Sequence, residues 1–301
     1  NDKVLKGKLE VLQSAWEMMI NRLMPAGADV SFDLTDKADK GDYVVLKGIV
    51  HNTRDNEEVT CTFLGPKPDA WKGSVVLWLT SNSVDSFGGD AGPLSGAAKK
   101  LIDAGIAIAC PQLYLPGAKE SPRNPVKSKD TKRNEWQWSS CYTYGYNPTL
   151  LAYRVHDVMS VVAMMKNHPD KRPEKIFLAG SDGFGAIAAA AGVMLKDTIA
   201  GAAIDTEGFR FASLTDVWDP MFVPGAVKYG DVPALLKLIA PVKVTALGED
   251  QAAVFLARHA AMEARFGPLG MACDSEPLRA RDAAGNPLPW DPADRVRDRV
   301  M

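Results

Sequence analysis

The fold is decided by one stretch of sequence, Lys175-Ile-Phe-Leu-Ala-Gly-Ser-Asp-Gly-Phe-Gly-Ala186. An apolar run typical of a buried strand enters a glycine-rich turn and leads directly into the alanine-rich helical run 186–195. A strand that turns straight into a helix needs small residues, because the two elements approach closely and the apex side chain is forced outward. The stretch therefore predicts a strand–turn–helix unit that displays one side chain for chemistry. A phosphate cradle is the alternative for such a turn, but its glycine spacing does not match the dinucleotide-binding pattern.

Strands and helices alternate around this turn. Further strands are predicted at 75–80, 106–110, 199–205, 242–247 and 269–273, and helices at 93–104, 149–167, 232–239 and 252–266. Near-continuous apolar strands that alternate with helices indicate βαβ units around a parallel sheet covered on both faces. We therefore predict an α/β protein with a doubly wound, mostly parallel sheet.

The N-terminal part follows another pattern. Apolar residues at helical spacing predict an amphipathic helix over 5–24, and three β-like segments follow it at 30–34, 43–52 and 58–64. Polar, turn-rich stretches separate these segments, which indicates antiparallel hairpins at one edge of the sheet. With no internal repeat and no Gly/Ser-rich linker, we expect a single domain over 1–301. Residues 1–70 would form its N-terminal helix and hairpins, and 275–301 a C-terminal surface tail.

Composition excludes several classes of protein. The 301 residues include 35 basic and 37 acidic side chains, so no positive excess is available for a nucleic acid. No apolar run approaches the roughly 20 residues needed to span a bilayer, and we expect no membrane partner. The chain begins Asn1-Asp2-Lys3, as expected of a processed mature form or a trimmed segment.

Cysteine usage leaves the compartment open. Cys61, Cys110, Cys141 and Cys273 are widely spread, without a C-x-x-C pair. Cys61 and Cys110 lie in apolar strand-like runs, where a buried free thiol is expected. An even number of cysteines also permits disulfides, so export to the periplasm or outside the cell stays open. No metal motif is visible, and we expect neither a metal nor another cofactor.

Together, these motifs resemble the α/β-hydrolase superfamily, and more narrowly its acetyl xylan esterase and dienelactone-hydrolase-like branch. The resemblance covers roughly residues 5–274, in the order of helix, hairpins, strand 75–80, a helix with Arg-Val-His-Asp157, and the glycine-rich turn. The segment Tyr142-Thr-Tyr-Gly-Tyr-Asn-Pro-Thr149, followed by Leu-Leu-Ala-Tyr-Arg-Val-His-Asp157, is similar to a stretch in bacterial members. The resemblance implies the α/β-hydrolase fold and carboxylic-ester hydrolase descent.

In that family the turn reads G-x-S-x-G, with serine as the nucleophile, and two alignments are open here. If Gly180 is the first glycine, Asp182 occupies the nucleophile position and the second glycine is lost. If Ala179 is the first small residue, Ser181 occupies the apex. We favour the first alignment, because it keeps Gly185 at the start of the helix as the branch does.

The resemblance implies a carboxylate after strand 242–247, and Glu249 or Asp250 is the candidate there. The same pair could instead cap the helix predicted at 252–266. After the preceding strand, Asp205 or Glu207 could also face the cleft or serve as a cap.

The general base is the missing part. A serine hydroxyl needs a neighbouring base, normally histidine, to become a nucleophile at neutral pH. In the family this histidine lies on a loop after the last strand, but the last histidine in this chain is His259, within the predicted helix 252–266. His259 is thus the candidate base, although a structural role fits it better. An aspartate nucleophile of the dehalogenase type would need a histidine too, so the standard triad is not intact.

A long polar segment at 111–147 carries a cluster of aromatic residues. Aromatic rings stack on apolar sugar faces, and tyrosine hydroxyls bond to sugar hydroxyls. The cluster therefore predicts a substrate-facing wall, or else a loop anchored to the core by its rings. The candidate substrate-binding residues are Trp136, Trp138, Tyr142 and Tyr144.

Two functions are open on this evidence. The first is an esterase-like protein, similar to acetyl xylan esterases, that acts on or associates with acylated carbohydrate through a degenerate site. Its substrate would be a small-molecule or polysaccharide ester. The second is a catalytically inactive domain that serves as the assembly or glycan-binding half of a larger esterase. A second hydrolase domain or a homo-oligomer would then be its partner.

Overall fold

A computed structural model describes residues 2–81, 87, 94–119, 121, 144–145, 147–239 and 242–249. The chain divides into two compact units, 1–267 and 268–301, and all of the described residues belong to the first. The helix predicted at 252–266, the strand at 269–273 and the tail 275–301 lie outside the described residues. The single-domain organisation stays a prediction.

A mixed sheet forms the centre of the first unit, with its described strands in the order β1-β2-β3-β5-β4-β6-β7-β8. The strands are β1 Val30–Asp39, β2 Tyr43–Asn52, β3 Glu57–Pro66, β4 Ser74–Leu79, β5 Ile106–Pro111, β6 Lys175–Gly180, β7 Gly201–Asp205 and β8 Lys243–Leu247. Strands β1, β2, β3 and β5 pair antiparallel in succession, whereas β5, β4, β6, β7 and β8 run parallel. The predicted α/β fold with an antiparallel edge is confirmed.

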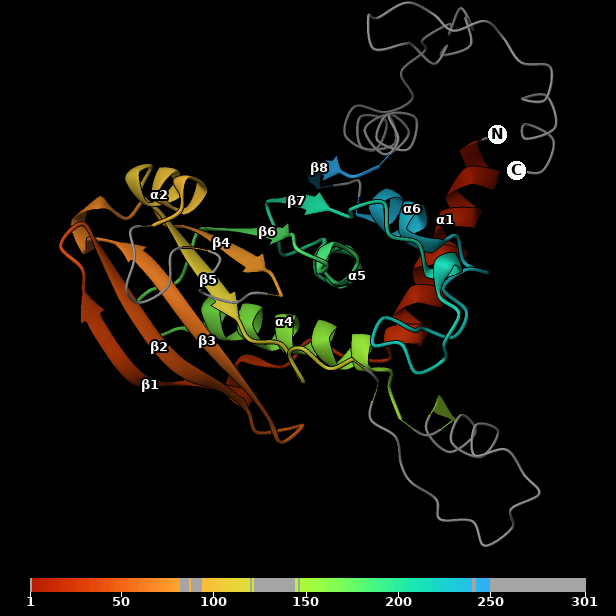
Figure 1. Cartoon of the computed structure of the whole chain (residues 1–301), viewed down its shortest axis with the longest axis horizontal. Coiled ribbons are helices and arrows are strands. Elements are labelled where there is room, and N and C mark those ends of the chain that lie inside the picture. The colour runs from red at the N-terminus through yellow and green to blue at the C-terminus, as the bar shows by residue number, and fades with distance from the viewer. Residues whose placement is uncertain are drawn as a thin grey trace, which may run out of the picture. The chain divides into compact units, whose positions relative to one another are not determined.

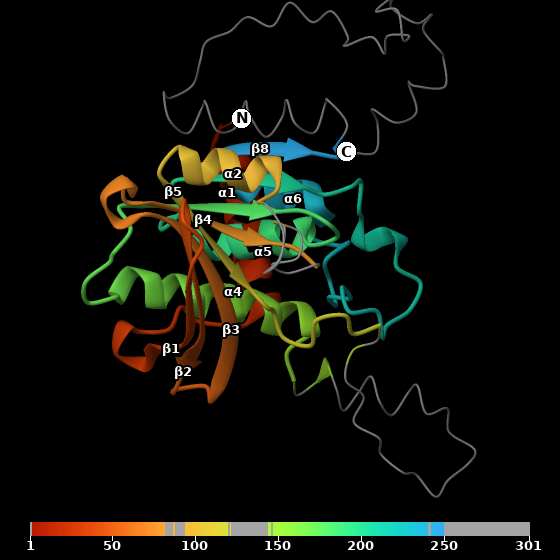
Figure 2. The ribbon, with the colours of Figure 1, turned by 60° about the vertical axis from the view of Figure 1, so that its left-hand side comes forward.

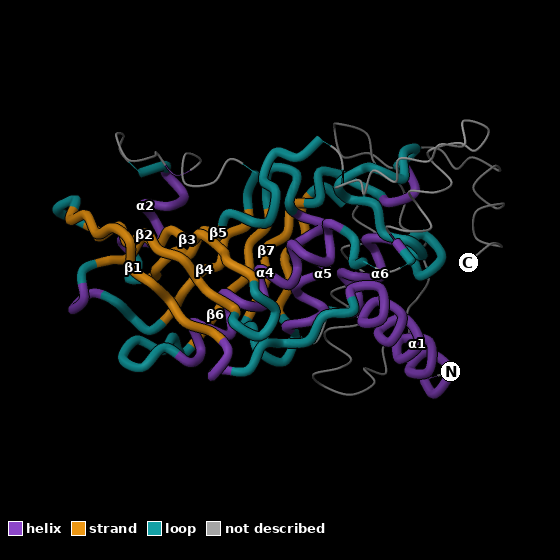
Figure 3. The backbone as a smooth tube through the Cα atoms, turned by 90° about the horizontal axis from the view of Figure 1, so that it is seen from below, coloured by secondary structure: helices purple, strands orange, loops and turns teal. Residues whose placement is uncertain are grey.

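Helices cover both faces of this sheet. They are α1 Asp2–Ile20, α2 Gly96–Asp103, α4 Leu150–Asn167, α5 Gly185–Leu195 and α6 Asp231–Leu238, with short 3-10 turns η1 Gly27–Asp29, η2 Pro68–Ala70 and η4 Phe211–Ser213. Helices α1, α4, α5 and α6 lie on one face and α2 lies on the other (Figures 1 and 3). None of the helices within the described residues is long and apolar enough to cross a membrane.

Each face of the sheet has its own apolar core. The larger core lies around α4, which begins after the Thr149 cap, whose hydroxyl accepts the Ala152 N–H at 3.2 Å. A smaller core lies under α2. Cys61 belongs to the larger core and Cys110 to the smaller one, so these neighbouring-strand thiols point to opposite faces. Both are buried and free, as predicted, and burial raises the pKa of Cys110 to about 12.

Two element boundaries differ most from the sequence prediction. Strand β1 continues to Asp39 instead of ending at Leu34, because a register shift between Leu34 and Asp36 lets the polar residues that follow pair with β2. Helix α1 ends at Ile20, since Asn21 adopts a left-handed φ of 47° that stops the helix. The extended β1 and its partners β2 and β3 twist steeply away from the parallel strands (Figure 2).

Candidate functional site

The candidate site is the turn between β6 and α5. Asp182 and Gly183 form this turn with left-handed φ angles of 52° and 81°. A positive φ is uncommon for a residue other than glycine and is often found at functional turns. Asp182 is exposed, whereas Ser181 before it is half-buried. The turn thus displays Asp182, the residue that the favoured alignment places in the nucleophile position.

Close packing explains the glycines on either side of the apex. A Cβ atom built on Gly185 would lie 1.8 Å from the Asp205 carbonyl oxygen, so the first turn of α5 touches the end of β7. A Cβ atom on Gly180 would lie 2.4 Å from the Cβ of Ala188. Both positions therefore require glycine for steric reasons. These contacts supply the close strand–helix approach that the sequence pattern predicts.

Hydroxyl groups surround the Asp182 carboxylate. Thr80 Oγ1 donates to Asp182 Oδ2 at 2.8 Å, and Ser181 Oγ donates to the same oxygen at 3.0 Å. Trp78 Nε1 in turn donates to Ser181 Oγ at 3.0 Å. The Ser181 proton is therefore directed at a carboxylate, and its oxygen accepts an indole N–H.

Glu207 occupies the other side of the turn. The Gly183 N–H donates to Glu207 Oε1 at 2.7 Å, and the backbone of Glu207 is itself left-handed with a φ of 50°. In α/β-hydrolases the N–H of the residue after the nucleophile is one donor to the oxyanion. With Asp182 at the apex, that donor is the Gly183 N–H. The Gly183 N–H is thus already bonded to a carboxylate.

Glu249, one candidate for the acid, follows β8 and is held in an ion pair with Arg210, whose side chain is 31% exposed. The Glu249 side chain is 0% exposed, and its carboxylate oxygens lie 2.8 and 2.5 Å from the two terminal guanidinium nitrogens of Arg210. The Thr206 hydroxyl also donates to Glu249. Glu249 therefore ties the end of β8 to the segment after β7. Asp250, the other candidate, lies outside the described residues.

Removing the partner of this buried carboxylate should destabilise the protein. We expect Arg210→Ala to lower the free energy of unfolding by about 1–3 kcal/mol, because Glu249 loses a charge-assisted, bidentate partner while buried. Urea unfolding followed by circular dichroism measures the change. Exposed Arg54 provides the matched control, Arg54→Ala, for which a change within about 0.5 kcal/mol is expected. Equal stability of the two variants would contradict this role of the ion pair.

The described histidines lie elsewhere. His51 contacts Asp33 and Glu58 on the hairpins, and buried His156 on α4 places Nδ1 2.5 Å from Glu57 Oε2. The Nδ1 atom of His168 accepts backbone N–H groups from the turn after α4. Among residues 2–249, as far as they are described, no imidazole bonds to the 181–182 turn and no His, Cys, Asp or Glu cluster could hold a metal. His259 lies outside the described residues and stays a prediction.

The aromatic wall is described only at Tyr144. Its hydroxyl donates to the Val217 carbonyl at 2.6 Å, and its ring packs against Trp218 and Phe222. Tyr144 thus anchors its segment to the loop after β7. Trp136, Trp138 and Tyr142 lie outside the described residues, and their substrate role stays a prediction.

Trp78 and Thr80 were not identified from the sequence as site residues. They lie at the carboxyl end of β4, which is the neighbour of β6 in the sheet. The available signal was their place at the end of a predicted parallel strand, because such ends meet at one edge of the sheet.

Solved structures with a similar fold were found, although no family model and no curated protein matches the sequence. A Bacteroides fragilis protein assigned as an acetyl xylan esterase aligns with a TM-score of 0.59 and 14% identity, over 86% of this chain and 72% of that chain. An acetyl xylan esterase from Thermoanaerobacterium sp. aligns with a TM-score of 0.51 and 11% identity, over 83% and 84%. A glucuronoyl esterase from Solibacter usitatus aligns with a TM-score of 0.54 and 13% identity, over 78% and 73%. At these identities the likeness concerns the fold, which is that of the α/β-hydrolase esterases.

Proposed function

We propose that this chain is an esterase-like α/β-hydrolase domain of carboxylic-ester hydrolase lineage, which associates with acylated carbohydrate and lacks a working Ser-His-Asp triad. Two kinds of observation support the proposal. The structural neighbours include acetyl xylan and glucuronoyl esterases. The turn between β6 and α5 exposes Asp182, with a left-handed φ of 52°, and Asp182 is the residue that the favoured alignment assigns to the nucleophile position.

The contact between Gly183 and Glu207 carries the proposal. An ester carbonyl that is attacked develops a negative charge, and the loss of one oxyanion donor typically lowers kcat by about 10²–10³-fold. Here the Gly183 N–H is already bonded to Glu207 at 2.7 Å, and the carboxylate would repel an oxyanion. Attack by Asp182 on an acyl carbon would also produce an anhydride and would still need a base to activate water. This geometry favours binding over turnover.

Ester turnover and ligand binding test the proposal separately. We expect the full chain to hydrolyse 4-nitrophenyl acetate no faster than buffer, and to show the same rate as Ser181→Ala and Asp182→Ala. Isothermal titration calorimetry with acetylated xylo-oligosaccharides should nevertheless show binding, which weakens in Trp136→Ala and Trp138→Ala. Turnover that disappears with Ser181→Ala or Asp182→Ala would overturn the loss of hydrolysis. Absence of binding would overturn the association with acylated carbohydrate.

A second candidate is the non-catalytic assembly half of a larger esterase. The first helix favours it: Val11 and Met18, two turns apart on α1, are 61% and 77% exposed. Residues seven apart lie on the same side of a helix, so these two exposed apolar side chains share one side of α1. Light scattering after size exclusion should then give an oligomer that the double variant Val11→Glu/Met18→Glu dissociates. A monomeric full chain at micromolar concentration would speak against self-assembly.

A further inference from the structure

A cavity of about 370 Å³ lies near the amino ends of the parallel strands, whereas the 181–182 turn lies at their carboxyl ends. The cavity wall includes Val75 and Ala107, near the starts of the parallel strands β4 and β5, whereas the turn follows the end of β6. The hairpin strands β1 to β3 supply one wall and the carboxyl-terminal end of α4 the other. A cavity of this volume is within the range, roughly 300–1,000 Å³, that proteins use for small ligands.

The lining is apolar and partly aromatic. Phe32, Leu46 and Phe63 project from the sheet, and Met164 and Met165 from α4. Phe32 and Phe63 meet edge to face, with 5.4 Å between ring centroids. Leu34, which also lines the cavity, is 53% exposed although it is a large apolar side chain. Such a surface favours a hydrocarbon body over a sugar or a nucleotide.

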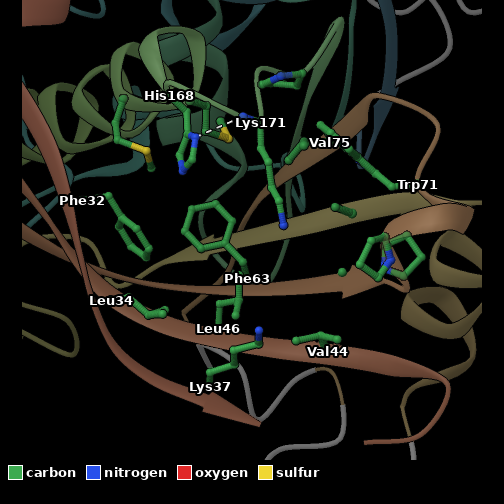
Figure 4. A pocket seen from close by; sticks show the side chains of 17 residues that line it. Phe32, Leu34, Lys37, Val44, Leu46, Phe63, Trp71, Val75, His168 and Lys171 are labelled. Atoms are coloured by element: carbon green, nitrogen blue, oxygen red, sulfur yellow. Dashed lines mark hydrogen bonds between the residues drawn. The ribbon is translucent and has the colours of Figure 1, made fainter. Parts of the chain in front are cut away.

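Two lysine side chains also line the cavity. Lys37 of β1 and Lys171 after α4 extend from opposite sides toward the same space (Figure 4). Neighbouring Asp39 is already engaged by Lys67, whose Nζ lies 2.5 and 2.7 Å from its carboxylate oxygens. Within the described part of the chain, neither Lys37 nor Lys171 forms an ion pair.

His168 adds a neutral donor. Its Nδ1 accepts the backbone N–H groups of Asp170 and Lys171 at 3.2 and 3.1 Å. A nitrogen that accepts carries no proton, so the ring proton of the neutral form lies on Nε2. His168 lines the cavity and can therefore donate one hydrogen bond beside the lysines.

We propose that this cavity binds a single-chain amphiphile with a carboxylate head, such as a medium-chain fatty acid. The hydrocarbon chain would lie between Phe63 and Met165, and the carboxylate would bind Lys37 and Lys171. An uncharged hydrocarbon would leave the two ammonium groups without a role, and a polyanion would leave the apolar wall exposed. Charge and surface together fit one anionic group attached to one apolar chain.

Gly65 gives a sharp test of the cavity. It lies on the β3 wall, lacks a left-handed φ, and a Cβ atom built on it meets no heavy atom within 4 Å. Gly65→Leu should therefore fill the cavity without straining the backbone. Binding of decanoate to the full chain, measured by calorimetry and by the fluorescence of Trp71 in the cavity wall, should be weakened by at least about tenfold. Gly65→Ala, a smaller filling, should weaken it less.

The lysines test the class of ligand. Lys37→Glu/Lys171→Glu should weaken decanoate binding by about tenfold or more and leave decanol binding within about twofold, because only decanoate carries the charge. The control is Lys6→Glu/Lys8→Glu, which makes the same change of charge on exposed positions of α1. The fluorescence change on decanoate binding is also measured in Trp71→Phe. The part of the change that this variant loses comes from Trp71 in the cavity wall.

The outcomes separate clearly. Decanoate binding that Gly65→Leu and the cavity lysine variant weaken, and that the α1 variant does not, supports the proposal. Equal affinity for decanoate and decanol would overturn the role of the lysines. Unchanged decanoate binding in a folded Gly65→Leu protein would overturn the cavity as the site. If Gly65→Leu does not fold, unchanged decanoate binding in Gly65→Ala would overturn it instead. Because this cavity is distant along the strands from the 181–182 turn, the ester assay is expected to be unaffected by either result.

Discussion

Gly185→Ala is expected to lower the free energy of unfolding by about 3 kcal/mol or more, because overpacking against backbone cannot be relieved by a rotamer change. The added methyl group would lie 1.8 Å from the Asp205 carbonyl oxygen and 2.6 Å from its carbon. The first turn of α5 or the end of β7 would have to move. Urea unfolding measures the loss, and either movement would also disturb the contact between Gly183 and Glu207.

Gly96 offers a matched control for this substitution. It begins α2, has no left-handed φ, and a Cβ atom built on it meets nothing within 4 Å. Gly96→Ala should leave stability unchanged or raise it by about 0.5–1 kcal/mol through helix propensity. If both alanine variants unfold at the same urea concentration, the close approach of α5 to β7 is not the reason for glycine at position 185.

The second large effect concerns pH. Asp157 on α4 is 5% exposed, and burial raises the pKa of its carboxyl to about 8. Its Oδ2 accepts the Tyr114 N–H at 2.6 Å, and neighbouring Arg154 donates to the Tyr114 and Leu115 carbonyls at 3.1 and 2.9 Å. The same burial lowers the pKa of Arg154. Through these hydrogen bonds, buried Asp157 and Arg154 hold the segment after β5 against α4.

The sign of the pH effect follows from proton binding. Between about pH 4 and pH 8 the folded protein keeps the Asp157 proton and the unfolded chain does not, so stability falls as pH rises through that window. We expect the free energy of unfolding to be several kcal/mol lower at pH 8 than at pH 5, since one unit of pKa shift corresponds to about 1.4 kcal/mol. Urea titrations at a series of pH values measure this slope.

Asp157→Asn removes the titration and keeps a similar shape. The variant should lose most of the slope between pH 5 and pH 8, and its stability should exceed that of the unchanged chain most clearly at pH 8. Asp170→Asn, at an exposed position of the turn after α4, should keep the slope. An unchanged slope in Asp157→Asn would show that other groups set the pH dependence.

Much of the fold could be predicted from the sequence because local patterns specify it. The parallel strands β4 to β8 are short apolar runs that alternate with helices, and this alternation predicts them. The β1 strand was predicted too short, since its polar second half is held by pairing with β2 across a register shift. No local pattern reports such a pairing.

The candidate site could be predicted only in part. The choice between the two alignments of the turn stays a prediction. The residue that Gly185 approaches, Asp205 at the end of β7, could not be predicted, because the contact joins separate elements. Likewise, the Glu207 contact to Gly183 depends on two turns that meet at the sheet edge. The cavity could not be found from the sequence, because its lining residues come from separate elements that only the folded chain brings together.

The polar second half of β1 has a consequence for solubility. Among the described strands, β1 ends the sheet on one side, and an outermost strand can recruit a strand from another copy. Asp33, Asp36, Lys37 and Asp39 place charge along it, and the register shift interrupts its regular ladder. Charges and irregularities of this kind discourage intermolecular strand addition. The outermost strand therefore protects the protein against aggregation through its own sheet.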